Sequence, residues 1–201
     1  MSGALAGALG ATLFGFRQSP PVSIASWAEG ALGEEETAKQ LRALEKEGWV
    51  VLHDLVNGSR NFDHVVLGPT GVYCLNSKWS GYRLERTDDG RFVGRHRYDD
   101  DIYISIDSIL RRARGEAAAL REQIEARCGT RLWVQPVIVW WGEVANGGRT
   151  VDGVGVVQGK NLADRLRAQT GRPVPQFERV VAVLRPGRHS KLSASSQVRA
   201  R

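Results

Sequence analysis

Apolar and polar positions follow two different periods along this chain, and each period predicts its own kind of element. Apolar side chains three and four positions apart are typical of amphipathic helices. This spacing predicts helices at residues 33–47, 106–126 and 161–169, the last capped by Asn161. The 106–126 segment has the longest apolar stripe, so we expect it to pack along one face of a sheet.

Segments rich in Val, Leu and Tyr, bounded by Gly, Asn, Pro and Ser, predict strands. They lie at residues 49–55, 62–67, 72–76, 81–84, 132–140 and 154–157. The continuous apolar run at 132–140 is typical of a central strand covered on both faces. The order helix, meander, helix, strand, strand, helix predicts an α/β fold, a three-layer core with a mixed central β-sheet flanked by helices.

One predicted hairpin gathers polar side chains on a single face. A tight turn at Pro69–Thr70 makes the numbers of paired residues add to 139, which places Asp63 opposite Asn76. Directly opposed residues have Cβ atoms about 4.5 to 5.5 Å apart, close enough to share one ion. Lys78 follows Asn76 by two positions and therefore lies on the same face.

A fourth candidate, Glu34, lies on the first predicted helix. It stands one turn before Ala38 and extends the apolar stripe of that helix, so we expect its carboxylate to face the sheet. A buried, unpaired charge is costly, so Glu34 needs a partner. A divalent cation, a lysine or the amides of a helix end would each serve.

The string GALGEEETA at residues 30–38, followed by NFDHVVLGPTGVYCLNSKWSG at 61–81, resembles the nuclease-related domain (NERD) family. That family is part of the restriction-endonuclease-like superfamily with the PD-(D/E)XK site pattern. The resemblance runs from about residue 30 to residue 183, and it implies phosphodiester hydrolysis of DNA or a related polynucleotide, assisted by Mg or Mn.

Position by position, the resemblance implies a role for each candidate. Asp63 would be a metal ligand, Glu34 the helix carboxylate at the metal, and Lys78 the group that activates the attacking water and stabilises charge at phosphorus. Hard cations prefer oxygen ligands, and a bound cation polarises the phosphoryl oxygen. A lysine adds positive charge where negative charge develops.

The chain departs from the family pattern at Asn76, where the pattern has Asp or Glu. An amide oxygen can bind a metal but brings no charge, and the loss of one carboxylate weakens binding by about 10³-fold. Two interpretations therefore stay open: a nuclease weakened at this position, or a catalytically inactive module that binds nucleic acid or acts as a scaffold. Restoring a carboxylate by Asn76→Asp is expected to raise metal affinity.

The charge distribution gives little further support for nucleic-acid binding. The chain has 201 residues and a globular composition, with 28 basic and 22 acidic residues, a net charge of +6. Five of the basic residues lie in 185–201, so the rest of the chain carries only 6 − 5 = +1. Arg111 and Arg114 are candidates for phosphate contacts and Trp79 for base stacking, although such arginines are also typical of a solvated helix face.

We expect three parts: an apolar arm with a proline linker at 1–21, the nuclease-related domain at 22–184, and a basic, disordered tail at 185–201. The uncharged run at 4–16 would reach about 20 Å as a helix, short of the roughly 30 Å of a bilayer core. It is either a surface-packed arm or a membrane contact. Cys74 and Cys128 lie far apart in apolar surroundings, which favours free thiols and a cytoplasmic protein.

Overall fold

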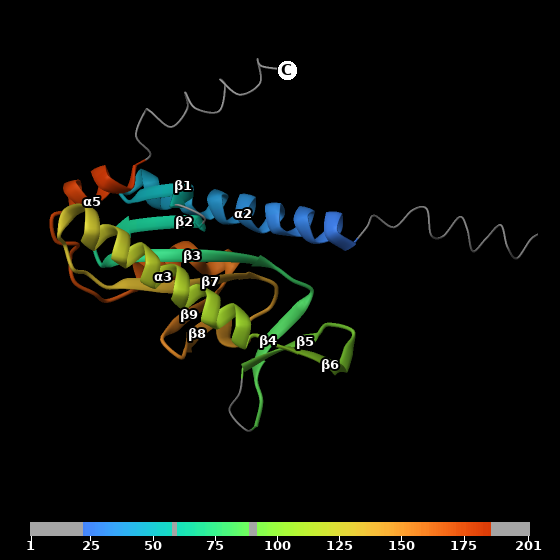
Figure 1. The fold of residues 1–201 in the computed structure, drawn as a ribbon. Coiled ribbons are helices and arrows are strands. Elements are labelled where there is room, and N and C mark those ends of the chain that lie inside the picture. Colours follow the sequence, from blue (N-terminus) through green and yellow to red (C-terminus); the bar gives the residue numbers. More distant parts are fainter. Residues whose placement is uncertain (1–21, 58–59, 89–91, 186–201) are drawn as a thin grey trace, which may run out of the picture.

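The computed structural model describes residues 22–57, 60–88 and 92–185 (Figure 1). The expected arm at 1–21 lies outside the described residues, as does the expected tail apart from Arg185. In the part of the chain that is described, no helix is long and apolar enough to cross a membrane.

The centre of the fold is a six-stranded sheet in the order β1-β2-β3-β7-β9-β8. The strands are β1 (Val50–Asn57), β2 (Arg60–Gly68), β3 (Gly71–Trp79), β7 (Val134–Trp141), β8 (Gly148–Val151) and β9 (Val154–Gln158). Strands β3, β7 and β9 run parallel to one another, and the other neighbours are antiparallel. The sheet is therefore mixed, as the sequence predicted.

Helices cover both faces of this sheet and complete the three layers (Figure 1). They are α2 (Val22–Lys46), α3 (Asp107–Cys128), α4 (Leu162–Arg167) and α5 (Phe177–Leu184). Helices α3 and α5 share one apolar cluster with the sheet, and α2 and α4 share the cluster on the other face. The predicted fold class, a restriction-endonuclease-like α/β core, is confirmed.

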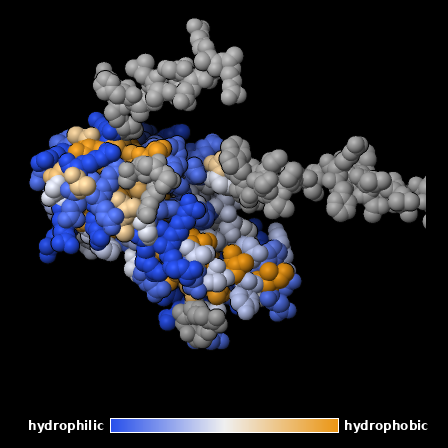
Figure 2. All heavy atoms as spheres, viewed as in Figure 1, coloured by the Kyte–Doolittle hydropathy of each residue, from blue (hydrophilic) through white to orange (hydrophobic). Residues whose placement is uncertain are grey.

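Strand β3 shows how the period of two divides its side chains between these layers. Val72 and Cys74 pack with α3 and α5, whereas Tyr73 and Leu75 pack with α2 and α4. Alternation then carries Asn76 to the α3 side, where the polar end of the strand begins. The exposed side of α3 is mainly hydrophilic, as an amphipathic helix requires (Figure 2).

The segment predicted as the fourth strand of the meander belongs to another sheet. Strands β4 (Tyr82–Arg86), β5 (Phe92–His96) and β6 (Asp99–Ser105) form a separate antiparallel sheet. The free edge of β3 that a fourth meander strand would need is taken by β7. Strand β4 is tied instead to the end of β7, because the Trp140 indole N–H donates a hydrogen bond of 2.9 Å to the Tyr82 carbonyl.

Element boundaries differ from the predictions at several ends. Helix α2 begins eleven residues before the expected start at Gly33 (33 − 22 = 11), and α4 ends at Arg167 rather than at Gln169. Asn161 occupies the N-cap position of α4, but its side chain makes no capping hydrogen bond. Strands β5, β6 and β8 and helix α5 were not anticipated, because their apolar patterns are short.

Candidate functional site

The candidate site lies where strand β2 separates from strand β3. Their pairing runs from Gly68–Gly71 to His64–Leu75, so the predicted register, with numbers adding to 139, is confirmed. Beyond that pair the ladder stops, although β1 stays paired with β2 to Asn57–Arg60 and β3 stays paired with β7 to Trp79–Trp141. The two strands therefore diverge, and polar side chains occupy the opening.

Asp63 is the first β2 residue beyond the ladder. Its Oδ2 accepts a hydrogen bond of 3.0 Å from the Ser77 backbone N–H, so a side chain takes the place of the missing strand pairing. Burial raises the pKa of the Asp63 carboxyl, and the Ser77 hydrogen bond and the Lys78 charge oppose that rise. The carboxylate is thus held in place in surroundings that disfavour its charge.

Lys78 lies at the end of β3 and is partly buried. Its Nζ donates a hydrogen bond of 3.0 Å to the Ser77 carbonyl. Burial lowers the pKa of the Lys78 ammonium, while the nearby Asp63 carboxylate is the strongest influence in the opposite direction. The acid and the amine therefore stabilise each other's charged form in a partly desolvated place.

Helix α2 is fixed against the end of β3 by close backbone contact and by a hydroxyl network. A Cβ at Gly33 would lie 3.2 Å from the Trp79 backbone nitrogen, so glycine permits the approach. The Thr37 hydroxyl donates to the Gly33 carbonyl, at 2.7 Å, and accepts from Ser77 Oγ and from the Trp141 indole N–H, both at 2.8 Å. These contacts set the position of the helix next to the site.

Glu34 follows Gly33 and is the carboxylate that α2 brings to this opening. Burial raises its pKa, and the negative charges of Asp63 and Asp54 raise it further, while the Lys78 ammonium lowers it. The same three candidates, Glu34, Asp63 and Lys78, thus influence one another although they come from three different elements. Asp54 was not singled out in the sequence.

Asn76 is 1% exposed and faces α3. Its Nδ2 donates a hydrogen bond of 2.9 Å to Oε2 of Glu116. Its Oδ1 is buried and has no hydrogen-bond partner among the described residues. Buried polar atoms are nearly always paired, so the unpaired amide oxygen of Asn76 needs an explanation.

Glu116 is, after Asp54, a second residue near the site that the sequence did not single out. Its side chain is 11% exposed, and its Oε1 accepts a hydrogen bond of 2.8 Å from Arg112 Nε. A signal was present, because Glu116 lies three positions after Ala113 and four before Leu120, in the middle of the apolar stripe of α3. The same argument had identified Glu34.

His64 lies next to Asp63 but on the other face of β2. Its Nδ1 lies 2.8 Å from Nδ1 of His53. Burial lowers the pKa of His64 to about 4, and the neighbouring His53 contributes to the shift. His64 is therefore neutral at pH 7 and adds no charge to the cluster.

The residues predicted to bind nucleic acid lie in different surroundings. Arg111 is exposed, and Arg114 donates a hydrogen bond of 3.2 Å to the Asp152 carbonyl, at the turn between β8 and β9. Trp79 is 41% exposed and stacks on Trp141, with ring centroids 6.3 Å apart. Of these residues, Trp79 lies next to the site in sequence, directly after Lys78.

The donor set fits a hard divalent cation that has few protein ligands. Among the described residues, no group of three or more His, Cys, Asp or Glu side chains is placed to hold a metal ion. The Asp63 carboxylate and the unpaired Asn76 Oδ1 nevertheless offer two oxygen atoms, with Glu34 nearby. Mg²⁺ commonly takes one or two carboxylates and completes its shell with water and substrate phosphate.

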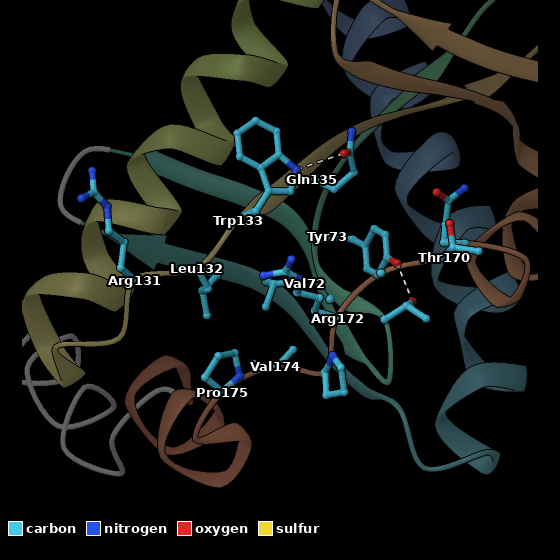
Figure 3. A pocket seen from close by; sticks show the side chains of 15 residues that line it. Val72, Tyr73, Arg131, Leu132, Trp133, Gln135, Thr170, Arg172, Val174 and Pro175 are labelled. Carbon is cyan, nitrogen blue, oxygen red and sulfur yellow. Dashed lines mark hydrogen bonds between the residues drawn. The ribbon is translucent and has the colours of Figure 1, made fainter.

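A cavity of about 450 Å³ lies at the opposite end of β3 and β7 (Figure 3). It is lined by residues that include Tyr73, Arg131, Trp133, Gln135 and Arg172. Tyr73 is near the beginning of β3, whereas the polar cluster is at the end of that strand. The cavity is therefore separate from the candidate site.

Comparison with known proteins gave one finding. Residues 29–141 match the family described as nuclease-related domain, a match that spans more than half of the chain. No curated protein and no solved structure gave a match. The matched range contains Glu34, Asp63, Asn76, Lys78 and Glu116.

Proposed function

The chain belongs to the nuclease-related domain family, and on that basis we propose that it acts on DNA or a related polynucleotide by hydrolysing phosphodiester bonds with Mg²⁺ or Mn²⁺. One observation carries the proposal. A partly buried carboxylate, Asp63, lies near the partly buried Lys78 ammonium group at the opening between β2 and β3, and Asn76 on the same strand as Lys78 has an unpaired amide oxygen. Oxygen ligands next to a fixed cation are the groups that this reaction requires.

Each side chain has a distinct part in the proposed reaction. Asp63 and the Asn76 Oδ1 would hold the metal ion, with Glu34 as a further carboxylate on its α2 side. The bound ion would polarise the phosphoryl oxygen and lower the pKa of a coordinated water. Lys78 would hold the reacting phosphate and stabilise the negative charge that develops on it. The Asp63–Ser77 hydrogen bond keeps the carboxylate in place before substrate binds.

The role of Lys78 is testable by removing its charge while keeping its length. We expect Lys78→Met to lower Mn²⁺-dependent cleavage of plasmid and single-stranded DNA by about 10²- to 10³-fold. Mn²⁺ affinity should stay the same or rise, because a positive charge next to the site is lost. The measurements are a gel assay of cleavage with Mn²⁺ or EDTA, and calorimetry of Mn²⁺ binding.

Lys46→Met is the matched control, since Lys46 is exposed at the far end of α2. Equal cleavage by the wild type and Lys78→Met would contradict the proposed role.

A second candidate function is a catalytically inactive module that binds nucleic acid or acts as a scaffold. It is favoured by Asn76, which stands where the family pattern has an acid. If the wild-type protein binds DNA without added metal and does not cleave it with Mn²⁺, the result would support this second function over hydrolysis.

Trp79 is the proposed base-stacking residue, because it is exposed directly after Lys78. We expect Trp79→Ala to weaken binding of single-stranded DNA by about 1–3 kcal/mol, measured by fluorescence anisotropy. Trp133→Ala is the control, because Trp133 is 65% exposed but lies at the opposite end of the sheet. Equal losses in both variants would exclude a specific role for Trp79.

We also propose that the protein is cytoplasmic, on the basis of its cysteines. Cys74 and Cys128 are both buried free thiols, and free cysteines are the rule in reducing compartments.

A further inference from the structure

We propose that Glu116 is a positioning residue for Asn76, and that the Glu116–Asn76 pair replaces the carboxylate that the family pattern has at position 76. This inference rests on the proposed function. It assigns Glu116 no contact with the metal, because both of its oxygens already accept hydrogen bonds, from Asn76 and from Arg112.

The first step of the argument concerns the orientation of the Asn76 amide. An ionised carboxylate only accepts hydrogen bonds, so it pairs with the NH₂ end of an amide and repels the oxygen end. The 2.9 Å bond from Nδ2 to Glu116 therefore prevents the amide from turning over. Oδ1 is left unpaired on a side chain that is 1% exposed. Without Glu116 the amide could present either end to the opening.

The second step concerns charge. The Glu116 carboxylate lies within hydrogen-bond distance of Asn76, so it brings its charge next to the site although its oxygens already accept bonds from Asn76 and Arg112. A carboxylate that accepts a hydrogen bond from an amide also polarises it and makes the amide oxygen a better ligand. Asn76 thereby supplies the oxygen atom and Glu116 supplies the charge. A carboxylate at position 76 would supply both.

The third step concerns Arg112, which holds the other oxygen of Glu116 one helical turn away. The Arg112 side chain is 66% exposed, whereas the Glu116 side chain is 11% exposed. The ion pair therefore extends from the protein surface to the buried side of α3. The bond restrains the Glu116 side chain. Partners of this kind set the orientation of metal-binding groups, and their loss commonly lowers metal affinity by 10- to 100-fold.

The contact changes what Asn76→Asp alone should do. A carboxylate introduced at position 76 would stand at hydrogen-bond distance from Glu116 with no donor between them, and two acceptor groups so placed repel each other and turn apart. The expected gain in metal affinity should therefore be absent at pH 7. It should appear when Glu116→Gln is added, because the new amide at 116 can donate to the new carboxylate at 76.

The test is a double-mutant cycle read by calorimetry with Mn²⁺ alone. We expect Glu116→Gln to weaken Mn²⁺ binding by about 10-fold, and Asn76→Asp to bind no more tightly than wild type. The double variant should bind at least about 10-fold more tightly than either single variant. Glu122→Gln, an exposed change on the same helix, should leave Mn²⁺ binding unchanged.

Thermal unfolding of each variant without metal separates positioning from a purely structural role. A structural role would lower the melting temperature of Glu116→Gln but leave Mn²⁺ affinity at the wild-type value, and that result would overturn the inference. Additive effects of the two substitutions would also overturn it. Wild-type Mn²⁺ affinity in Asp63→Asn would instead overturn the proposed function itself, which distinguishes the two failures.

Discussion

Asp63→Asn is expected to unfold at a higher temperature than the wild-type protein when no metal is present, and to lose metal-dependent cleavage. Burial disfavours the Asp63 charge, so a neutral amide of the same shape removes that penalty. The new side chain retains an oxygen that can accept the Ser77 N–H bond. We expect a gain of about 1 kcal/mol, or about 2–4 °C in melting temperature, and a loss of cleavage of about 10³-fold or more.

The pH dependence of this effect has a definite sign. The folded-state pKa of Asp63 lies above its unfolded value, so the wild type binds more protons folded than unfolded and loses stability as pH rises through the folded pKa. The melting temperature of Asp63→Asn should therefore exceed that of the wild type at pH 7, and the gap should close as pH falls below the unfolded pKa of Asp63.

The measurements are thermal unfolding without metal across that pH range and cleavage with Mn²⁺. Asp88→Asn, a change at an exposed carboxylate, is the control and should alter neither. A less stable Asp63→Asn protein would show that Asp63 serves the fold and not the metal. Full cleavage by the variant would remove Asp63 from the reaction.

Leu120→Ala is expected to produce the largest loss of stability. Leu120 is fully buried on α3, in the cluster shared with β2, β3 and α5. Truncating a buried leucine costs about 2.7–5.0 kcal/mol, because apolar contacts are lost and a cavity remains. Leu120 also lies four positions after Glu116, so it anchors the turn of α3 that carries the positioning residue.

Chemical denaturation monitored by tryptophan fluorescence measures this prediction. The free energy of unfolding should fall by about 3–4 kcal/mol in Leu120→Ala, whereas Glu122→Ala on the exposed side of α3 should change it by less than about 0.5 kcal/mol. A loss below about 1 kcal/mol for Leu120→Ala would mean that α3 is not held by this contact.

Much of the core could be predicted because its signals are local. The Pro69–Thr70 turn determines the register of the β2–β3 hairpin, and the observed pairs follow that register. The apolar run at 132–140 predicted a covered central strand, and β7 is buried along most of its length. The stripe of 106–126 predicted α3, including the face that packs on the sheet.

The candidate site was predictable only in part. The hairpin pattern brought Asp63, Asn76 and Lys78 to one face, but their roles stay predictions. Glu116 lies 40 positions from Asn76, and a pattern on one helix does not say which strand that helix will cover. The opening between β2 and β3 could not be predicted from the sequence either, because strand periodicity indicates where strands form and not where the pairing of two strands ends.

Sequence patterns were sufficient for most of the longer elements, the hairpin register and the family, since these depend on periods of two and 3.6 and on turn residues that act over a few positions. Long-range packing was needed to show that β4 joins a second sheet, that α2 brings Glu34 near Asp63, and that Glu116 holds Asn76. Such contacts form between distant segments, and they depend on how the whole chain buries its apolar faces together.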